Sequence, residues 1–237
     1  MPILTVAAYK GGVGKTTLAL ELAYLLDAVL VDLEWDEGGA SRRWGYRSDQ
    51  RRSGGAVTTA LDGGKAPRPL AGNHKARLVP GDPDLGHGNY DAEDVAARLV
   101  EWSDQWGSEW VVVDTHPGAN AITLGAMRAA HCIVVPTPLE MPELDGLEGL
   151  LREAADYPLL LVPNKVPYAP PAAGKRRLRE LATHWNVAVG PVVSSYRALG
   201  QRQQRMAVSA IEPTPARWER YVDELRLVAD EVKRMAK

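Results

Sequence analysis

The stretch that decides the fold is Lys10-Gly11-Gly12-Val13-Gly14-Lys15-Thr16-Thr17. It follows an apolar run at 3–8, which predicts a strand, and it leads into an amphipathic stretch at 15–26, which predicts a helix. Glycines permit the tight backbone turn that directs several N–H groups at one phosphate group at a helix N-terminus. The stretch therefore predicts a phosphate-binding loop between a strand and a helix.

Short apolar runs alternate with amphipathic stretches along the rest of the chain. The expected strands are 3–8, 28–33, 76–79, 109–114, 131–135, 158–162 and 187–189. The expected helices are 15–26, 91–106, 119–129, 140–155, 174–184 and 215–236. This alternation predicts an α/β fold of three layers, a doubly wound, mainly parallel sheet with helices on both faces. Residues 36–75 are rich in Gly, Arg and Ser, and predict a short helix plus a mobile surface segment.

The composition is that of an ordinary soluble protein, with 45% apolar and 24% charged residues among 237. This length suits one domain over residues 1–237. The single cysteine, Cys132, lies in an apolar run and is expected to be a buried thiol, which disfavours a disulfide or a metal-cluster site. The first residues lack the pattern of a signal peptide, and no run reaches the roughly 18 apolar residues of a membrane span. We therefore expect a cytoplasmic protein with no membrane partner.

The phosphate-binding loop assigns roles to its side chains. Lys15 is expected to neutralise the β- and γ-phosphates of ATP, and the Thr16 hydroxyl to ligate Mg²⁺. The ordinary loop pattern has a glycine five residues before Gly14, where this chain has Tyr9. The departure is informative because an extra lysine, Lys10, stands next to it.

With Lys10 in place, the stretch resembles the deviant Walker A motif K-G-G-x-G-K-[ST] of the ParA/MinD family, a branch of the P-loop ATPases. The resemblance implies that Lys10 reaches the partner's phosphates in an ATP-bound homodimer. It covers nearly the whole chain, but is specific only at the P-loop, at the strand described next and, loosely, at 28–41. Because the chain begins at the P-loop strand, no extra N-terminal DNA-binding domain is expected, and the chain is most similar to short ParA-type partition ATPases.

The apolar run 110–113 ends in Asp114, the arrangement of a Walker B strand. A carboxylate at the C-terminal end of a buried parallel strand lies beside the phosphate loop, where it can hold Mg²⁺ through water. The family continues with Thr-Pro-Pro-Gly, and this chain with Thr115-His116-Pro117-Gly118. The resemblance implies that Gly118 senses the γ-phosphate through its backbone. His116 departs from the family, and is either a general base or a polar loop residue.

After the second strand the family has Asp-x-Asp-Pro-Gln-Gly, and its second Asp orients the attacking water. Glu34 stands at that position here. We rank Glu34 first for this role, with Asp36 and Asp32 as alternatives. A displaced carboxylate lowers turnover before it lowers binding, because phosphoryl transfer depends on positioning and electrostatics.

Two further regions complete the expected sites. Asn164 and Lys165 follow the strand at 158–162 and resemble the family's adenine contact, which suits an amide that offers both a donor and an acceptor. Residues 165–205 contain eight Lys/Arg against one acid, in a chain of net charge −2. This segment is either a solvated basic surface that balances the acidic stretch 82–114 or a surface for non-specific DNA. The candidate DNA contacts are Lys175, Arg176, Arg177, Arg179, Arg197, Arg202 and Arg205.

The expected function is partition of plasmid or chromosome DNA, with slow ATP hydrolysis stimulated by a ParB-like centromere-binding partner and the ATP-bound form on the nucleoid. One alternative is a MinD-like membrane-cycling regulator. The last helix, 215–236, has an apolar stripe but mixes acids and bases on its polar face, which favours packing against the core over lipid binding. The other alternative is a metabolic ligase similar to dethiobiotin synthetase, a class that usually lacks a lysine at the Lys10 position.

Overall fold

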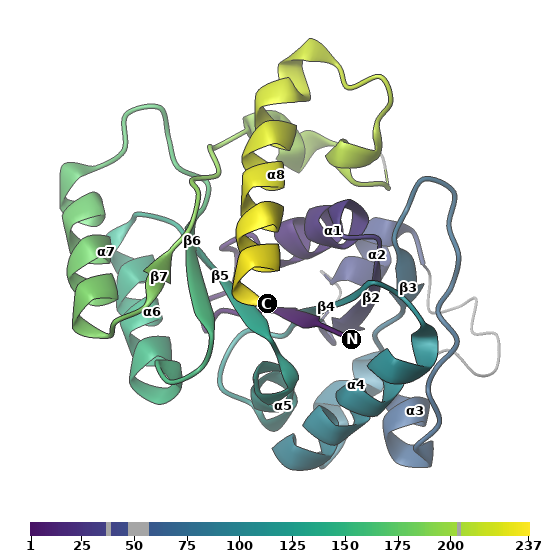
Figure 1. The fold of residues 1–237 in the computed structure, drawn as a ribbon. Helices are drawn as coiled ribbons and strands as arrows, with labels where there is room; N and C mark the ends of the chain where they lie inside the picture. The colour runs from purple at the N-terminus through teal and green to yellow at the C-terminus, as the bar shows by residue number, and fades with distance from the viewer. Residues whose placement is uncertain (37–38, 47–56, 203–204) are drawn as a thin grey trace.

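The computed structural model describes residues 1–36, 39–46, 57–202 and 205–237. Within these ranges seven strands form one sheet in the order β3-β2-β4-β1-β5-β6-β7 (Figure 1). Every neighbouring pair of strands is parallel. The strands are β1 (Ile3–Val6), β2 (Ala28–Leu33), β3 (Arg77–Val79), β4 (Trp110–Thr115), β5 (Cys132–Thr137), β6 (Leu159–Pro163) and β7 (Ala188–Val189).

Helices connect the strands and cover both faces of the sheet. The α-helices are α1 (Lys15–Leu25), α2 (Ala40–Trp44), α3 (Val57–Gly63), α4 (Ala92–Trp106), α5 (Ala121–Ala129), α6 (Met141–Ala154), α7 (Ala172–His184) and α8 (Ala216–Met235). Short 3₁₀ turns are η2 (Pro83–His87), η3 (Arg197–Gln201) and η4 (Val208–Ala210). The expected three-layer α/β fold is confirmed, together with all seven expected strands and all six expected helices.

Residues 36–75 depart in part from the sequence prediction. The sequence predicts one short helix and a mobile surface segment in this stretch, whereas the structure has two short helices, α2 and α3, so the prediction misses one helix. The physical reason is packing, because Val57 and Ala60 are buried against β2 and α4. The remainder of that prediction falls partly on 37–38 and 47–56, which lie outside the described residues.

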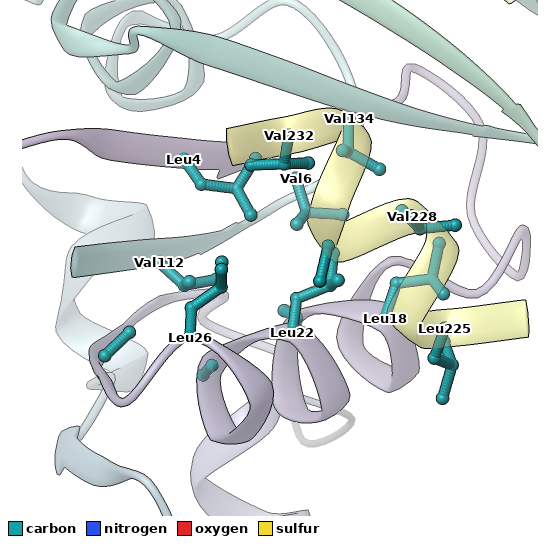
Figure 2. Packing of buried hydrophobic residues seen from close by; sticks show 14 of the residues in the cluster. Leu4, Val6, Leu18, Leu22, Leu26, Val112, Val134, Leu225, Val228 and Val232 are labelled. Atoms are coloured by element: carbon teal, nitrogen blue, oxygen red, sulfur yellow. The ribbon is translucent and has the colours of Figure 1, made fainter. Parts of the chain in front are cut away.

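Alternate residues of the central strands point to opposite faces of the sheet. On one face Leu4 and Val6 of β1 pack under α1 and α8, as Figure 2 shows. The stripe expected on the last helix takes part in this core, and its members Trp218, Tyr221, Val222, Leu225, Val228 and Val232 are buried. The expectation that this helix packs against the domain is therefore confirmed. Among the described residues, no helix has the length and apolar character needed to cross a membrane.

The opposite face is covered in two parts. Helices α3, α4 and α5 pack on β2 and β4, and helices α6 and α7 pack on β5 and β6. Cys132 is buried as expected, and burial raises the pKa of its thiol to about 12. The thiol is therefore a core group with little thiolate character.

The strand register brings three segments to one place. β1 lies between β4 and β5, and Val6, its last residue, is level with Asp114 of β4. Asp114 is also level with Asp32 of β2. The C-terminal ends of parallel strands at such a crossover point form the ligand crevice of doubly wound folds. The phosphate-binding loop and both acidic strand ends therefore meet at one edge of the sheet.

Candidate functional site

The phosphate-binding loop has the backbone that its glycines predict. Gly12 and Gly14 have positive φ values of 77° and 104°, a region that favours glycine. Gly14 is the N-cap of α1, and no side chain caps this helix. The first N–H groups of α1 lack intrahelical acceptors, so an anion would complete their hydrogen bonding. The loop therefore fits a phosphate group.

The segment after β6 supports this loop from the side. The Asn164 amide nitrogen donates to the Val13 carbonyl at 2.8 Å, and the Lys165 ammonium donates to the Gly12 carbonyl. Asn164 is buried, whereas Lys165 is exposed. The structure thus places both residues on the phosphate-binding loop, as structural supports that the sequence did not indicate. Their contact with adenine stays a prediction.

Gly14→Ala tests this packing. An added Cβ would lie 2.4 Å from Asn164 Nδ2, at a φ that L-residues rarely adopt. We expect a loss of about 1–3 kcal/mol in the free energy of unfolding, from the strained backbone and the displaced Asn164. Thermal melts without nucleotide measure it. Gly11→Ala is the matched control, because a Cβ at Gly11 meets nothing within 4 Å. Equal melting temperatures for the two variants would contradict the prediction.

Lys15 and Asp114 form the buried centre of the site. The Lys15 side chain is only 6% exposed, and Asp114 is fully buried. Burial lowers the pKa of the Lys15 ammonium, while the carboxylates of Asp114 and Glu34 oppose this shift. Burial, and then the neighbouring Asp32, raise the pKa of Asp114 well above its usual range. Each group is costly to bury alone, so their proximity stabilises the charged form of both.

The carboxylate of Asp114 has the features of a metal-binding group. Both of its oxygens are buried without a hydrogen-bond partner among the described residues. Thr16, at the start of α1, lies near enough for its hydroxyl to lower the pKa of this carboxyl. A hydrated divalent cation would satisfy the Asp114 oxygens and would bind hydroxyl and carboxylate oxygens together. The residues present therefore fit Mg²⁺.

Burial separates the three acids that the sequence left as alternatives. Asp32 accepts hydrogen bonds from the backbone N–H groups of Glu34 at 3.1 Å and Ser41 at 2.6 Å, so its two oxygens hold the loop after β2. Burial raises the pKa of Asp32 to about 6. The Asp36 side chain is 74% exposed, whereas that of Glu34 is 11% exposed. Glu34 also acts on the pKa values of Lys15 and Asp114, and its carboxylate, unlike that of Asp32, does not have both oxygens bonded to backbone N–H groups, so we keep it as the first candidate.

His116 joins this site, and no sequence pattern indicates its partner. Its Nδ1 is hydrogen-bonded to Glu34 Oε1, across 82 positions of the chain. Its ring stacks on Trp35, with centroids 3.7 Å apart and an angle of 10° between the planes. Two residues later Gly118 has a positive φ of 96°. The γ-phosphate contact of Gly118 stays a prediction.

Lys10 lies apart from these groups. Its side chain is exposed, and its stem lies over Gly146 of α6, where an added Cβ would be 2.5 Å from Lys10 Cγ. Next to it, the Tyr9 hydroxyl donates to Glu153 at 2.6 Å. Tyr9, at the position where an ordinary loop has glycine, therefore anchors the start of the loop to α6.

The candidate DNA contacts are divided into two groups. Lys175, Arg176, Arg177 and Arg179 lie on α7, beside β6 and β7, whereas Arg197, Arg202 and Arg205 lie in the segment that returns toward α1 and α2 (Figure 1). Arg177 pairs with Glu148 at 2.6 Å. Arg202 is half-buried over the Trp218 ring. Arg205 packs against Gly45, at the end of α2. The candidate contacts therefore come from two parts of the fold, and their role in DNA binding stays a prediction.

The curated proteins that are similar in sequence to this chain are chromosome-partitioning proteins. No protein-family model matches the chain. The chromosome-partitioning ATPase Soj of Thermus thermophilus is 33% identical over 153 residues, which cover 62% of this chain and 59% of Soj. The chromosome partitioning protein ParA of Caulobacter vibrioides is 32% identical over 169 residues, which cover 63% and 61%. The chain thus spans less than two thirds of the length of these curated relatives.

Solved structures share the fold over nearly the whole chain. An ATP complex of a Cyanothece McdA variant has a TM-score of 0.77 at 17% identity, and the match covers 99% of this chain and 96% of that one. Septum site-determining protein MinD of Pyrococcus horikoshii, complexed with Mg-ADP, has a TM-score of 0.73 at 18% identity and coverages of 99% and 97%. With the sequence relatives, these matches confirm the resemblance to the ParA/MinD family of deviant Walker A ATPases.

Proposed function

We propose, on the premise of this match to the ParA/MinD family, that the chain is a Mg²⁺-dependent ATPase of the partition type. It dimerises on ATP, binds DNA without sequence preference, and segregates plasmid or chromosome DNA with a ParB-like partner that stimulates hydrolysis. The observation that carries the proposal is the burial of Lys15 and Asp114 together beside the uncapped start of α1. A lysine placed in this way binds a nucleotide phosphate, and a carboxylate beside it holds the metal ion.

Each part of the site has a role in this reaction. Lys15 and the N–H groups of the loop bind the β- and γ-phosphates of ATP, and Asp114 and Thr16 hold Mg²⁺. The ion supplies positive charge to the phosphate oxygens. Glu34 orients the attacking water, since the described contacts of its carboxylate, from Asp36 N–H and His116, both fall on Oε1. The other oxygen, Oε2, is then available to the water.

Slow turnover is part of this proposal. Glu34 is longer by one methylene than the expected aspartate, and phosphoryl transfer depends on how the water is positioned, so a displaced carboxylate lowers the turnover. Intrinsic hydrolysis is therefore slow, and a partner protein that completes or tightens the site raises it. In the ATP state the protein is associated with the nucleoid, because DNA binding depends on the dimer.

The best candidates for DNA contacts are the exposed basic side chains of both groups. Lys175, Arg179 and Arg197 are exposed. Arg202 is a poorer candidate, because it packs on Trp218, and burial lowers the pKa of its guanidinium. An ATP-bound dimer carries two copies of each group, which doubles the number of phosphate contacts, so DNA affinity depends on ATP.

Arg197→Ala tests DNA binding. We expect the ATP-bound wild type to bind DNA of any sequence, with log affinity falling against log salt by about 0.9 per phosphate contact. The variant should bind all sequences more weakly and lower this slope by about one for each contact that is lost. Fluorescence anisotropy with ATP and with ADP, across a salt series, gives both quantities.

Arg226→Ala is the matched control, because Arg226 is exposed on α8, pairs with Asp223 at 3.0 Å and belongs to neither basic group. Its salt slope should equal that of the wild type. ATP-bound protein without DNA affinity even at low salt would contradict the partition function, and would leave a membrane-positioning or metabolic role for the same ATPase site.

A further inference from the structure

His116 stands at the point where two loops of the site meet. It follows β4 by one residue, between Asp114 and Gly118, and its ring reaches the loop after β2. Its carbonyl accepts a hydrogen bond from the Thr123 hydroxyl of α5 at 3.0 Å, so the backbone is held as well as the side chain. The family pattern Thr-Pro-Pro-Gly has proline at this position, and a proline side chain offers neither a hydrogen-bond donor nor an acceptor.

The surface beneath the His116 ring is itself fixed. Trp35 is half-buried against the core formed by β2, β4 and α4. Gly86 of η2 packs on the indole, where an added Cβ would lie 2.9 Å from Trp35 Cδ1. The stack between His116 and Trp35 is nearly parallel. The stack thus fixes the plane of the imidazole, and in this structure Nδ1 faces Glu34.

Glu34 needs such a restraint. Its side chain is longer by one methylene than the aspartate expected at this position. The added rotatable bond gives the carboxylate more conformations, although it must hold the water in one position. The described hydrogen bonds to its carboxylate come from Asp36 N–H at 3.2 Å and from His116, and both reach Oε1. Oε1 is therefore the anchored oxygen, and the carboxylate can pivot only about it.

We propose that His116 is a positioning residue for hydrolysis: it anchors the Glu34 carboxylate through Nδ1 and links the Glu34 loop to the Gly118 loop through its stack on Trp35. The proposal rests on the proposed ATPase function. In the tautomer that this contact requires, Nδ1–H donates to Oε1, and no proton is transferred. His116 acts on the rate only through Glu34.

Three substitutions separate the hydrogen bond from the stack. His116→Asn keeps a donor where Nδ1 stands but removes the ring, His116→Phe keeps the ring but removes the donor, and His116→Ala removes both. We expect kcat to fall by about tenfold or more in the alanine and phenylalanine variants, because a lost hydrogen bond to a charged group misplaces the water. His116→Asn should recover most of the activity. The affinity for ATP should change by less than about twofold in all three, as expected for an interaction that matters in the transition state.

A double-mutant cycle tests the route of action. Release of radiolabelled phosphate from ATP measures slow turnover by the full chain. Glu34→Gln should reduce it strongly, and His116→Ala should cause no further loss in that background. His184→Ala is the matched control, because His184 also contacts a tryptophan, Trp185, but lies on α7. Its turnover should equal that of the wild type.

Several results would overturn the proposal. Additive losses in the cycle, or an asparagine variant no better than alanine, would show that His116 does not act through a hydrogen bond to Glu34. The ligand atoms of Glu34, Asp36 and His116 lie within 4.8 Å of one another, so zinc binding is the rival explanation. Calorimetric binding of Zn²⁺ that is lost in His116→Ala and that raises kcat would favour it. If wild type and Glu34→Gln hydrolyse ATP equally, the proposed role of Glu34 fails instead, and the two failures remain distinct.

Discussion

Lys15→Ala is expected to abolish tight ATP binding. The ammonium is buried among the carboxylates of Asp114 and Glu34 and is the cation that the phosphate-binding loop presents at the start of α1. Without it, the triphosphate would meet these acids with much less positive charge to offset their repulsion. Loss of one partner of a buried charge pair costs about 2–5 kcal/mol, which corresponds to at least about 30-fold in Kd. Nucleotide titration followed by tryptophan fluorescence measures the change.

Two comparisons make this result interpretable. Lys15→Met keeps most of the buried stem and removes only the charge, so it should lose ATP affinity as fully as Lys15→Ala while disturbing the packing less. Lys233→Ala, on the exposed face near the end of α8, should bind ATP as the wild type does. Melting curves without nucleotide show whether each variant is folded. Unchanged ATP affinity in a folded Lys15 variant would remove the basis of the ATPase proposal.

Much of the fold could be predicted because its signals are local. Buried parallel strands such as 110–115 and 132–137 are continuous apolar runs, and even the three-residue edge strand Arg77–Val79 is predicted correctly. Helix α3 escapes prediction because its sequence, Val-Thr-Thr-Ala-Leu-Asp-Gly, has few apolar residues and low helix propensity. Its packing on β2 and α4 stabilises it, and that contact is not visible in a short window of sequence.

The same difference between local signals and contacts of distant residues applies to the site. The phosphate-binding loop and Asp114 follow from spacing alone, since the backbone geometry requires those residue types there. Asp32, Glu34 and Asp36 lie within five positions of one another, and only their burial and hydrogen bonds in the structure distinguish them. The bond between Glu34 and His116 joins distant parts of the sequence, so no local pattern could reveal it. For the same reason the sequence alone does not show that the basic run 165–205 is divided between α7 and the segment that contains η3.

Lys10→Ala is expected to leave ATP binding nearly intact and to abolish dimerisation and hydrolysis. In the protomer the Lys10 ammonium is on the surface, and its stem lies on α6 over Gly146. An exposed charge contributes about 1 kcal/mol or less within its own protomer, so ATP affinity should change by less than about fivefold. In an ATP-bound dimer the same ammonium would be desolvated against the partner's phosphates, where a charge-assisted contact is much stronger. Light scattering after size exclusion, with a slowly hydrolysed ATP analogue, should show a dimer for the wild type and a monomer for the variant.

Gly146→Ala distinguishes the role of the Lys10 charge from that of the contact between the Lys10 stem and α6. The new Cβ would displace the Lys10 stem from α6 but leave the charge in place, and the stem is flexible enough to move. If Lys10 leaves α6 to reach the partner, this variant should still dimerise with ATP, and alanine within α6 should stabilise that helix by about 0.5–1 kcal/mol. A dimer of normal stability from Lys10→Ala would show that the lysine does not cross to the partner. Failure of Gly146→Ala alone would instead place the essential contact of Lys10 on α6 of its own protomer, since the charge is intact and only that contact is lost.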